Sequence, residues 1–220
     1  MRKKGARGTI AGLLLLAAAL CLTLHNIRQD AAASARVRAT MQRLAPALET
    51  AQSARQSFDA SSQTVFPAEA EVVPDYSLDP QREMPVKCVD GTEYIGYLQL
   101  PSISLELPVI GAWSDAASKL APCRYAGTAY TGNFVIAGHN YKGHFRALKE
   151  LQPGDLVVFT DMDGNPFSYE VVASEKLSPQ AVDEMLDASW DLTLFTCTAG
   201  GENRLAVRCE RLAAQDLTGS

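Results

Sequence analysis

The sequence is poor in the residues that metal-binding and disulfide-stabilised proteins use. Its 220 residues include only five cysteines and three histidines. There is no C-x-x-C pair and the histidines do not cluster with cysteines, so the pattern excludes a zinc site and a disulfide scaffold. A single Cys88–Cys123 bridge in an oxidising compartment stays open. Apolar residues make up 47% of the chain and charged residues 20%, which is a globular balance.

Basic residues are scarce beyond the N-terminus. Residues 1–28 contain five basic residues and no acidic one. Because the whole chain carries a net charge of −5, residues 29–220 carry −10. Binding to nucleic acid depends on clustered lysine and arginine side chains that contact phosphates. The sequence has no such cluster, so we exclude nucleic acid as a partner.

The one long apolar run lies near the N-terminus. A basic tail over residues 1–8 precedes an uncharged run, rich in leucine and alanine, that extends from Gly8 to Leu24. Its length is near the lower end of the ~17–25 residues that span a bilayer, and the basic residues before it favour a cytoplasmic N-terminus. We predict a transmembrane signal anchor over residues 9–27. It would hold the protein in the cell membrane by a single pass, with the rest of the chain extracytoplasmic.

Two other interpretations of this run are weaker. A cleaved secretory signal needs small residues close to the end of the apolar run, and only the distant Ala33-Ser34-Ala35 provides them. A lipoprotein site at Cys21 would need a small residue at the position that Leu20 occupies.

Residues 28–85 have the composition of a stalk and spacer. Apolar residues recur at intervals of three and four, which predicts a helix with one apolar face; they are Val37, Met41, Leu44, Leu48 and Ala51. Pro46 interrupts this stripe, so we expect a kinked helix. Four prolines among polar residues over 59–85 are typical of a spacer that holds a domain away from the membrane.

Residues 86–215 have the pattern of a β-domain, because short apolar stretches alternate with turns. The strands that we expect are Tyr94–Leu100, Ser104–Ile110, Asn133–Ala137, Asp155–Thr160, Phe167–Glu175, Asp191–Cys197 and Arg204–Leu212. Short helices are expected over 115–120, 144–151 and 178–186. Residues 161–165 resemble the start of a calcium loop but lack the acidic residue at its end, which favours a plain turn. The spacing predicts a mainly β fold of about eight strands, in a barrel or sandwich.

Cys197 and Arg204 are the first candidate site residues. If the six residues between them form a hairpin loop, the two side chains lie opposite each other on paired strands, with Cβ atoms about 5 Å apart. A guanidinium beside a thiol favours the nucleophilic thiolate and can also bind an oxyanion. Taken alone, Cys197 can equally be an inert buried thiol.

His139 is the second candidate, because it follows the apolar strand Asn133–Ala137 through Gly138. An imidazole at a strand end can protonate a leaving amine and stabilise a thiolate. A lone histidine is also commonly a hydrogen-bonded structural residue. His144, five residues on, is a competitor that we rank lower, because a helical turn with a solvated side chain is expected there.

Three motifs together resemble the sortase family. Thr193–Cys197 reads T-L-F-T-C, which is similar to the sortase signature T-L-x-T-C. Ala137–Asn140 is similar to the histidine motif of that family and Arg204–Val207 to its arginine strand. The order of the three motifs agrees with that of the family, and the similarity in sequence pattern extends over Tyr94–Leu212. Each motif is weak alone, but the combination is specific.

The resemblance implies an eight-stranded sortase-type β-barrel with short helices and the catalytic residues His139, Cys197 and Arg204. Cys197 would attack an LPxTG-like C-terminal sorting motif and form a thioacyl-enzyme. An amine of a peptidoglycan precursor or of a pilin lysine would then accept the substrate protein. The resemblance also suggests a substrate or oxyanion role for Thr196 and Asn140. It implies no metal or organic cofactor; some relatives use calcium as an activator, but the sequence indicates no site.

The motifs favour a class B or class D relative within that family. Papain-like peptidases place cysteine before histidine, which is the reverse of the order here. An L,D-transpeptidase would have arginine at the position of Ala199. The non-enzymatic alternative is an anchored β-domain that acts as a binding or spacer module, with Cys197 merely buried.

Overall fold

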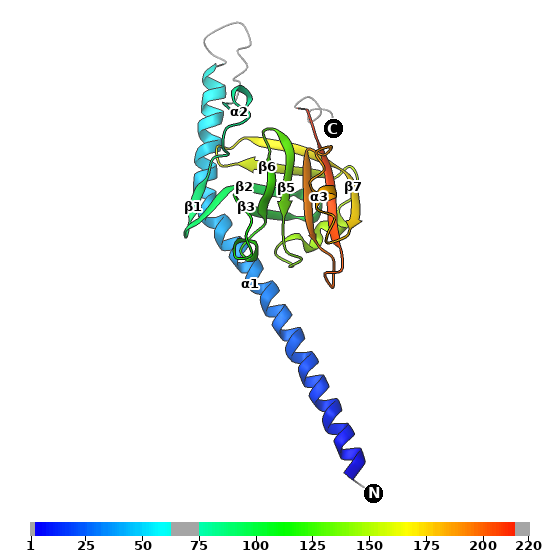
Figure 1. Cartoon of the computed structure of the whole chain (residues 1–220). Coiled ribbons are helices and arrows are strands. Elements are labelled where there is room, and N and C mark those ends of the chain that lie inside the picture. Colours follow the sequence, from blue (N-terminus) through cyan, green and yellow to red (C-terminus); the bar gives the residue numbers. More distant parts are fainter. Residues whose placement is uncertain (1–2, 63–74, 214–220) are drawn as a thin grey trace.

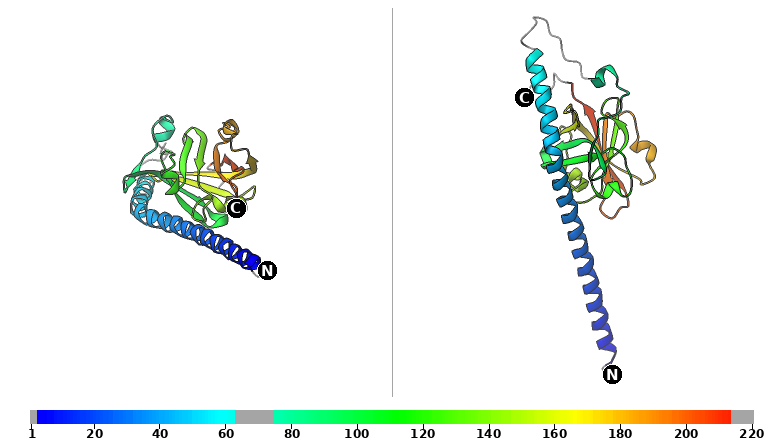
Figure 2. Two further views of the ribbon diagram at one scale, coloured as in Figure 1. Left: turned by 60° about the horizontal axis from the view of Figure 1, so that its bottom comes forward. Right: turned by 90° about the vertical axis from the view of Figure 1, so that its left-hand side faces the viewer.

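The computed structural model describes residues 3–62 and 75–213 as one long helix packed beside a β-barrel (Figure 1). Helix α1 (Lys3–Ser62) projects from one end of the barrel and then runs along its side (Figure 2). The short helix α2 (Asp75–Leu78) precedes the strands. The part of the predicted spacer over residues 63–74 lies outside the described residues.

The barrel contains strands β2 to β9, and their pairing closes on itself. The nine strands are β1 (Lys87–Val89), β2 (Thr92–Leu100), β3 (Leu105–Ile110), β4 (Cys123–Thr128), β5 (Gly132–Ala137), β6 (Leu156–Asp161), β7 (Pro166–Leu177), β8 (Leu192–Cys197) and β9 (Arg204–Arg211). The order is β1-β2-β3-β4-β5-β8-β9-β7-β6, and β2 pairs with β6. The pairs β3–β4 and β5–β8 are parallel and the others antiparallel. The predicted eight-stranded barrel is therefore confirmed, with β1 as a short addition to β2.

The elements between the strands are short. They are the 3-10 helices η1 (Pro101–Ile103), η2 (Ala117–Lys119) and η3 (Phe145–Glu150), and helix α3 (Val182–Met185) in the β7–β8 connection. The three helical turns expected from the sequence coincide with η2, η3 and α3. The turn at residues 161–165 is closed by the Asp161 carboxylate, which accepts hydrogen bonds from the backbone N–H of Asp163 and of Asn165 at 2.9 Å.

Strand β4 was missed by the sequence pattern for a local reason. Its side chains alternate only weakly between buried and exposed, and its pairing with β5 shifts register at two places. Gly127 has a φ of +64°, and a side chain there would collide with the Asn133 carbonyl group. Irregular pairing of this kind removes the strict two-residue period on which strand prediction depends.

The apolar stripe predicted in α1 is largely buried, and the side of the barrel covers it. Val37 belongs to the main barrel core, while Leu44 and Leu48 form a second cluster with Tyr94 and Ile110 of the barrel. The helix continues through Pro46 and changes direction alongside the barrel (Figure 2). A proline inside a helix removes one backbone hydrogen bond and favours such a bend. This part of α1 is thus packed on the domain, and the division of residues 28–85 into stalk and spacer stays a prediction.

The N-terminal part of α1 has the opposite character. Its leucines and isoleucines point to solvent, with exposures such as 66% for Leu13 and 65% for Leu22. The most apolar 18-residue window has a mean hydropathy of 2.1, and none of it is buried. An unburied apolar helix of this length is consistent with a signal anchor.

The cysteines that the sequence analysis left open as a pair are both free thiols. Cys88 is exposed on β1, whereas Cys123 is buried at the start of β4. The bridge is therefore absent from the structure, and Cys123 packs instead in the cluster that also contains Leu44 of α1.

Candidate active site

Cys197 and Arg204 lie opposite each other, as the sequence predicted. They are register partners at the ends of β8 and β9, and the Thr198 N–H donates to the Asn203 carbonyl at 2.9 Å to close the hairpin loop between them. Gly200 and Gly201 have φ values of +90° and +77°, which only glycine adopts easily. Because the two residues are register partners, the thiol and the guanidinium share one face at the rim. Both residues are half-buried.

His139 reaches the same rim because β5 and β8 are parallel neighbours. Ala137 pairs with Phe195, and the Gly138 N–H donates to the Phe195 carbonyl at 3.0 Å. A Cβ atom at Gly138 would lie 2.5 Å from the Phe145 ring, so this position requires glycine. The two strand ends therefore bring His139 and Cys197 together although 57 residues separate them in the sequence.

The imidazole of His139 is held by two neighbours. Its Nε2 lies 3.2 Å from the Ser118 hydroxyl, whose own hydrogen is directed to the Asp115 carbonyl at 3.3 Å. The imidazole tautomer decides which of the two groups donates in this pair. The Tyr141 ring stacks on the imidazole with centroids 4.9 Å apart. Burial, and then the nearby Lys119 ammonium, lower the pKa of His139, which the Asp115 carboxylate partly opposes.

The three candidate residues line one pocket of about 270 Å³. Its floor is formed by the ends of β5, β8 and β9. One wall comes from the β7–β8 connection and contributes Pro179, Val182 and Met185. The opposite wall comes from β4 and the segment before it and contributes Trp113, Asp115, Ser118 and Tyr125. The pocket therefore combines apolar side chains from both walls with the polar groups of Cys197, His139 and Arg204, which is typical of small ligand sites.

Aromatic contacts shape the second wall. The Trp113 and Tyr125 rings meet edge to face at 6.0 Å, and Tyr125 meets Phe195 at 5.3 Å. Trp113 remains 46% exposed, so a large apolar surface is open beside the reactive groups. The sequence analysis did not identify these residues. The only available signal was that Trp113 is one of two tryptophans in the chain.

The two further substrate candidates fare differently. Thr196 lines the pocket, but it points to the opposite face from Cys197 because side chains alternate along a strand. Its hydroxyl is buried and has no hydrogen-bond partner within the described chain, so its main chain is the part that faces the site. Asn140 is not among the residues that line the pocket, and its carbonyl accepts hydrogen bonds from Arg146.

His144 is buried, so the expectation of a solvated surface role was wrong. Its side chain has 0% exposure, and neither ring nitrogen has a hydrogen-bond partner in the part of the chain that the structure describes. Burial lowers the pKa of His144 to about 4. The nearby His139 lowers this pKa further by charge repulsion. The Tyr141 ring contacts both imidazoles, with centroids 4.9 Å from His139 and 5.4 Å from His144.

A closed β-barrel with a thiol, an imidazole and a guanidinium at one rim is suited to thiol-based acyl transfer. Residues 98–212 match the family model of the sortase domain, which is more than half of the chain. The chain therefore belongs to the sortase family of cysteine transpeptidases.

One curated relative and two solved structures illustrate what the chain is similar to. Sortase A of Bacillus anthracis is 31% identical over 121 residues, which are 52% of this chain and 57% of that relative, so less than two thirds of the relative is matched. Sortase C of Streptococcus pneumoniae has a similar structure, with a TM-score of 0.52 at 22% identity over 80% of this chain and 96% of that one. Clostridium perfringens sortase C, solved with the C-terminal cell wall sorting motif, has a TM-score of 0.50 at 24% sequence identity. That similarity covers 79% of this chain and 90% of the other.

The class within the family is not resolved by these similarities. The similar proteins include sortases A, C and D. Solved structures at these identities show the shared fold alone. The class B or class D prediction therefore stays a prediction.

Proposed function

We propose that this chain is a membrane-anchored, extracytoplasmic transpeptidase that cleaves an LPxTG-like sorting motif through a thioacyl-enzyme on Cys197. The single observation that supports this proposal most is the placement of Cys197, His139 and Arg204 around one pocket. In this proposal residues 1–8 are a cytoplasmic tail, 9–27 the anchor and 86–215 the catalytic domain.

The first half-reaction breaks the scissile peptide bond. The Cys197 thiolate attacks the carbonyl carbon, and Arg204 donates hydrogen bonds to the oxyanion that develops. When the carbon–nitrogen bond breaks, the leaving amine takes a proton from the His139 imidazolium, and a thioester remains on Cys197. The lowered pKa of His139 makes its imidazolium a stronger acid toward that amine.

The second half-reaction transfers the acyl group. An acceptor amine enters where the leaving amine departed and loses a proton to neutral His139 as its nitrogen attacks the thioester. The carbon–sulfur bond then breaks and the Cys197 thiolate is restored. Each step uses groups of the chain itself, so the proposal includes no metal or organic cofactor. The acceptor amine would belong to a peptidoglycan precursor or to a pilin lysine.

The test uses the full chain in detergent micelles, because α1 covers part of the barrel core. The protein is incubated with LPxTG-like peptides, with and without a small amine, and analysed by intact mass spectrometry. We expect a thioacyl adduct on Cys197 and an amine-exchanged product, and we expect Cys197→Ala to lose both. Hydrolysis without exchange would favour a peptidase. A wild-type protein that forms no adduct with any peptide would favour the anchored binding module.

A further inference from the structure

The loop that carries His139 is joined to α1 by charged groups. Residues 139–146 follow β5 and include the first two residues of η3. This segment is called the histidine loop below. The Asp30 carboxylate of α1 accepts two hydrogen bonds from the Arg146 guanidinium, at 2.7 and 2.9 Å, and one from the Lys142 N–H at 3.3 Å. The Asp30 side chain is only 19% exposed. Bidentate pairs of this kind fix orientation as well as distance.

Arg146 extends this contact to the neighbour of His139. Its Nη2 and Nε donate to the Asn140 carbonyl at 3.2 and 3.4 Å. One planar guanidinium therefore bonds both to Asp30 and to the carbonyl of Asn140, the residue that follows His139. Because the guanidinium is rigid and planar, a shift of Asp30 would be passed on to the histidine loop.

Close packing adds a second contact between α1 and the loop. A Cβ atom at Gly143 would lie 2.5 Å from the Cα of Ser34, so the two backbones touch at that point. The Ser34 hydroxyl in turn donates to the Asp30 carbonyl at 3.0 Å. These contacts fix the loop to α1 through backbone as well as through charge.

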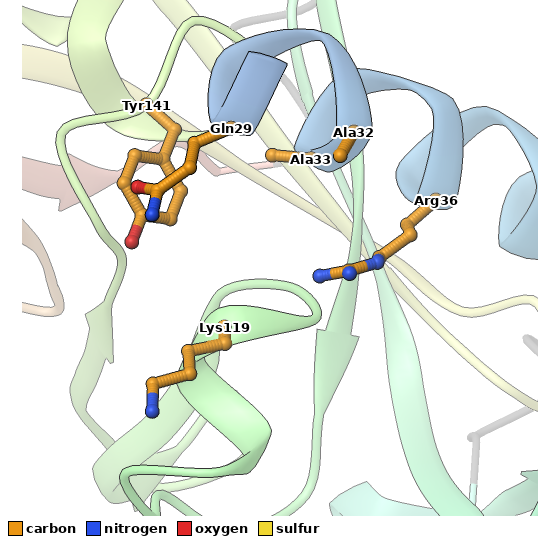
Figure 3. Close-up of a pocket in the computed structure, with 6 residues that line it drawn as sticks. All are labelled: Gln29, Ala32, Ala33, Arg36, Lys119 and Tyr141. Carbon is orange, nitrogen blue, oxygen red and sulfur yellow. The ribbon is translucent and has the colours of Figure 1, made fainter. Parts of the chain in front are cut away.

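The same part of α1 lies behind the supports of His139. Figure 3 shows Gln29, Ala33 and Arg36 of α1 around a pocket of about 290 Å³ that Tyr141 and Lys119 complete. Tyr141 stacks on the His139 ring, and Lys119 follows Ser118, which contacts His139 Nε2. The first residues of α1 after its apolar run are therefore neighbours of Tyr141, which stacks on the imidazole, and of Lys119, which follows Ser118 in the chain.

From these contacts we propose that Asp30 is a positioning residue for His139, so that the juxtamembrane part of α1 is a working part of the active site. The proposal rests on the proposed function for its kinetic consequences. The pair is only partly shielded from solvent, with Arg146 42% exposed, so its loss should cost the fold little. The expected effect of losing it is a displaced imidazole in a protein that remains folded.

A second ion pair provides a matched control. Arg43 of α1 pairs with Asp90 in the turn between β1 and β2, so it also joins the helix to the barrel. Its side chains are 56% and 77% exposed, and neither residue lines the candidate active site. Asp30→Asn and Asp90→Asn each remove one carboxylate from an ion pair that joins α1 to the barrel. Only Asp30 is bonded to the histidine loop.

The experiment compares both variants as full chains in detergent micelles. One readout is kcat and KM for peptide cleavage. The other is the rate of Cys197 alkylation by iodoacetamide as a function of pH, followed on the Cys197 peptide because Cys21 and Cys88 are also exposed. We expect Asp30→Asn to lower kcat about 10-fold with little change in KM, since small displacements of catalytic groups are costly. It should also change the rate of Cys197 alkylation, because a displaced imidazole alters the surroundings of the thiol in the pocket that both residues line.

Two further variants separate positioning from general damage. Asp30→Glu keeps the carboxylate and should restore part of kcat. The double variant Asp30→Asn/Arg146→Gln should be no worse than Arg146→Gln alone, because both changes break one contact. Equal kcat values and alkylation profiles for Asp30→Asn and Asp90→Asn would overturn the proposal. A wild-type chain without cleavage would refute the proposed function, and the alkylation profiles would still decide whether Asp30 positions His139.

Discussion

The rim of the barrel and the face of the barrel that contacts α1 are built in different ways. At the rim, strand register and a glycine-containing hairpin place three half-buried polar side chains around a pocket. On the α1 face, apolar side chains such as Leu44 and Leu48 are buried between elements that are distant in the sequence. The rim therefore carries the groups to which the proposed function assigns the chemistry, whereas Leu44 and Leu48 on the α1 face contribute buried apolar surface. Substitutions at the rim should therefore change kcat/KM, whereas substitutions on the α1 face should change the free energy of unfolding.

Arg204 should give the largest effect at the rim. Arg204→Lys keeps a positive charge but loses the planar fork of donors that an oxyanion requires. We expect kcat/KM for peptide cleavage to fall by about 10²- to 10³-fold, equivalent to about 3–4 kcal/mol of transition-state stabilisation. The free energy of unfolding should hardly change.

Arg208 is the matched control for Arg204, four residues on along β9. Its guanidinium is buried and donates to the Glu175 carboxylate at 2.6 Å and to the Thr193 hydroxyl at 3.0 Å, away from the candidate active site. Arg208→Lys should lower the free energy of unfolding and leave kcat/KM of the folded protein unchanged. If Arg208→Lys reduced kcat/KM as much as Arg204→Lys, the assigned role of Arg204 would be wrong.

Leu44 should give the next largest effect, and it concerns stability. Leu44→Ala removes a fully buried side chain between α1 and the barrel, which we expect to cost about 3 kcal/mol in the free energy of unfolding. Leu13→Ala, in the exposed part of the same helix, should change it by no more than about 0.5 kcal/mol. Urea unfolding followed by tryptophan fluorescence measures both, because Trp113 and Trp190 both lie in the barrel domain. Equal effects would mean that α1 does not pack on the barrel in solution.

Features that depend on local pattern could be predicted from the sequence. Most strands follow from short apolar stretches between turns, and the opposition of Cys197 and Arg204 follows from one hairpin. The proximity of His139 could not be obtained that way. It depends on a parallel pairing of β5 with β8 across a long connection, so it was inferred only from the resemblance to sortases.

Features that depend on which elements meet could not be predicted. The periodic stripe in α1 shows that one helix face is buried, but it does not show what covers that face. For the same reason the sequence pattern placed the buried His144 at the surface. The aromatic wall of Trp113 and Tyr125 was missed because its members come from separate segments.

His144 should give the smallest of these effects, and it tests where the boundary between the two regions lies. An unfolded chain binds a proton at His144 near its ordinary pKa of about 6.5, whereas the folded protein binds it only near pH 4. Between these values the unfolded state holds more protons, so stability falls as the pH decreases from about 6.5 to 4. The glutamine in His144→Gln cannot titrate there. The free energy of unfolding of the variant should therefore fall by about 2 kcal/mol less than that of the wild type over this pH range.

The measurement compares the free energies of unfolding of the wild type and His144→Gln at pH 7 and pH 4.5, so that groups common to both chains cancel. Because the charge of His139 contributes less than burial to the lowered pKa of His144, the pH dependence of kcat should shift only slightly in the variant. Parallel stability curves would mean that His144 is solvated in the folded protein. A shifted kcat profile with unchanged stability curves would instead assign His144 to the rim, and the histidine loop would then couple chemistry and packing through this residue as well as through Arg146.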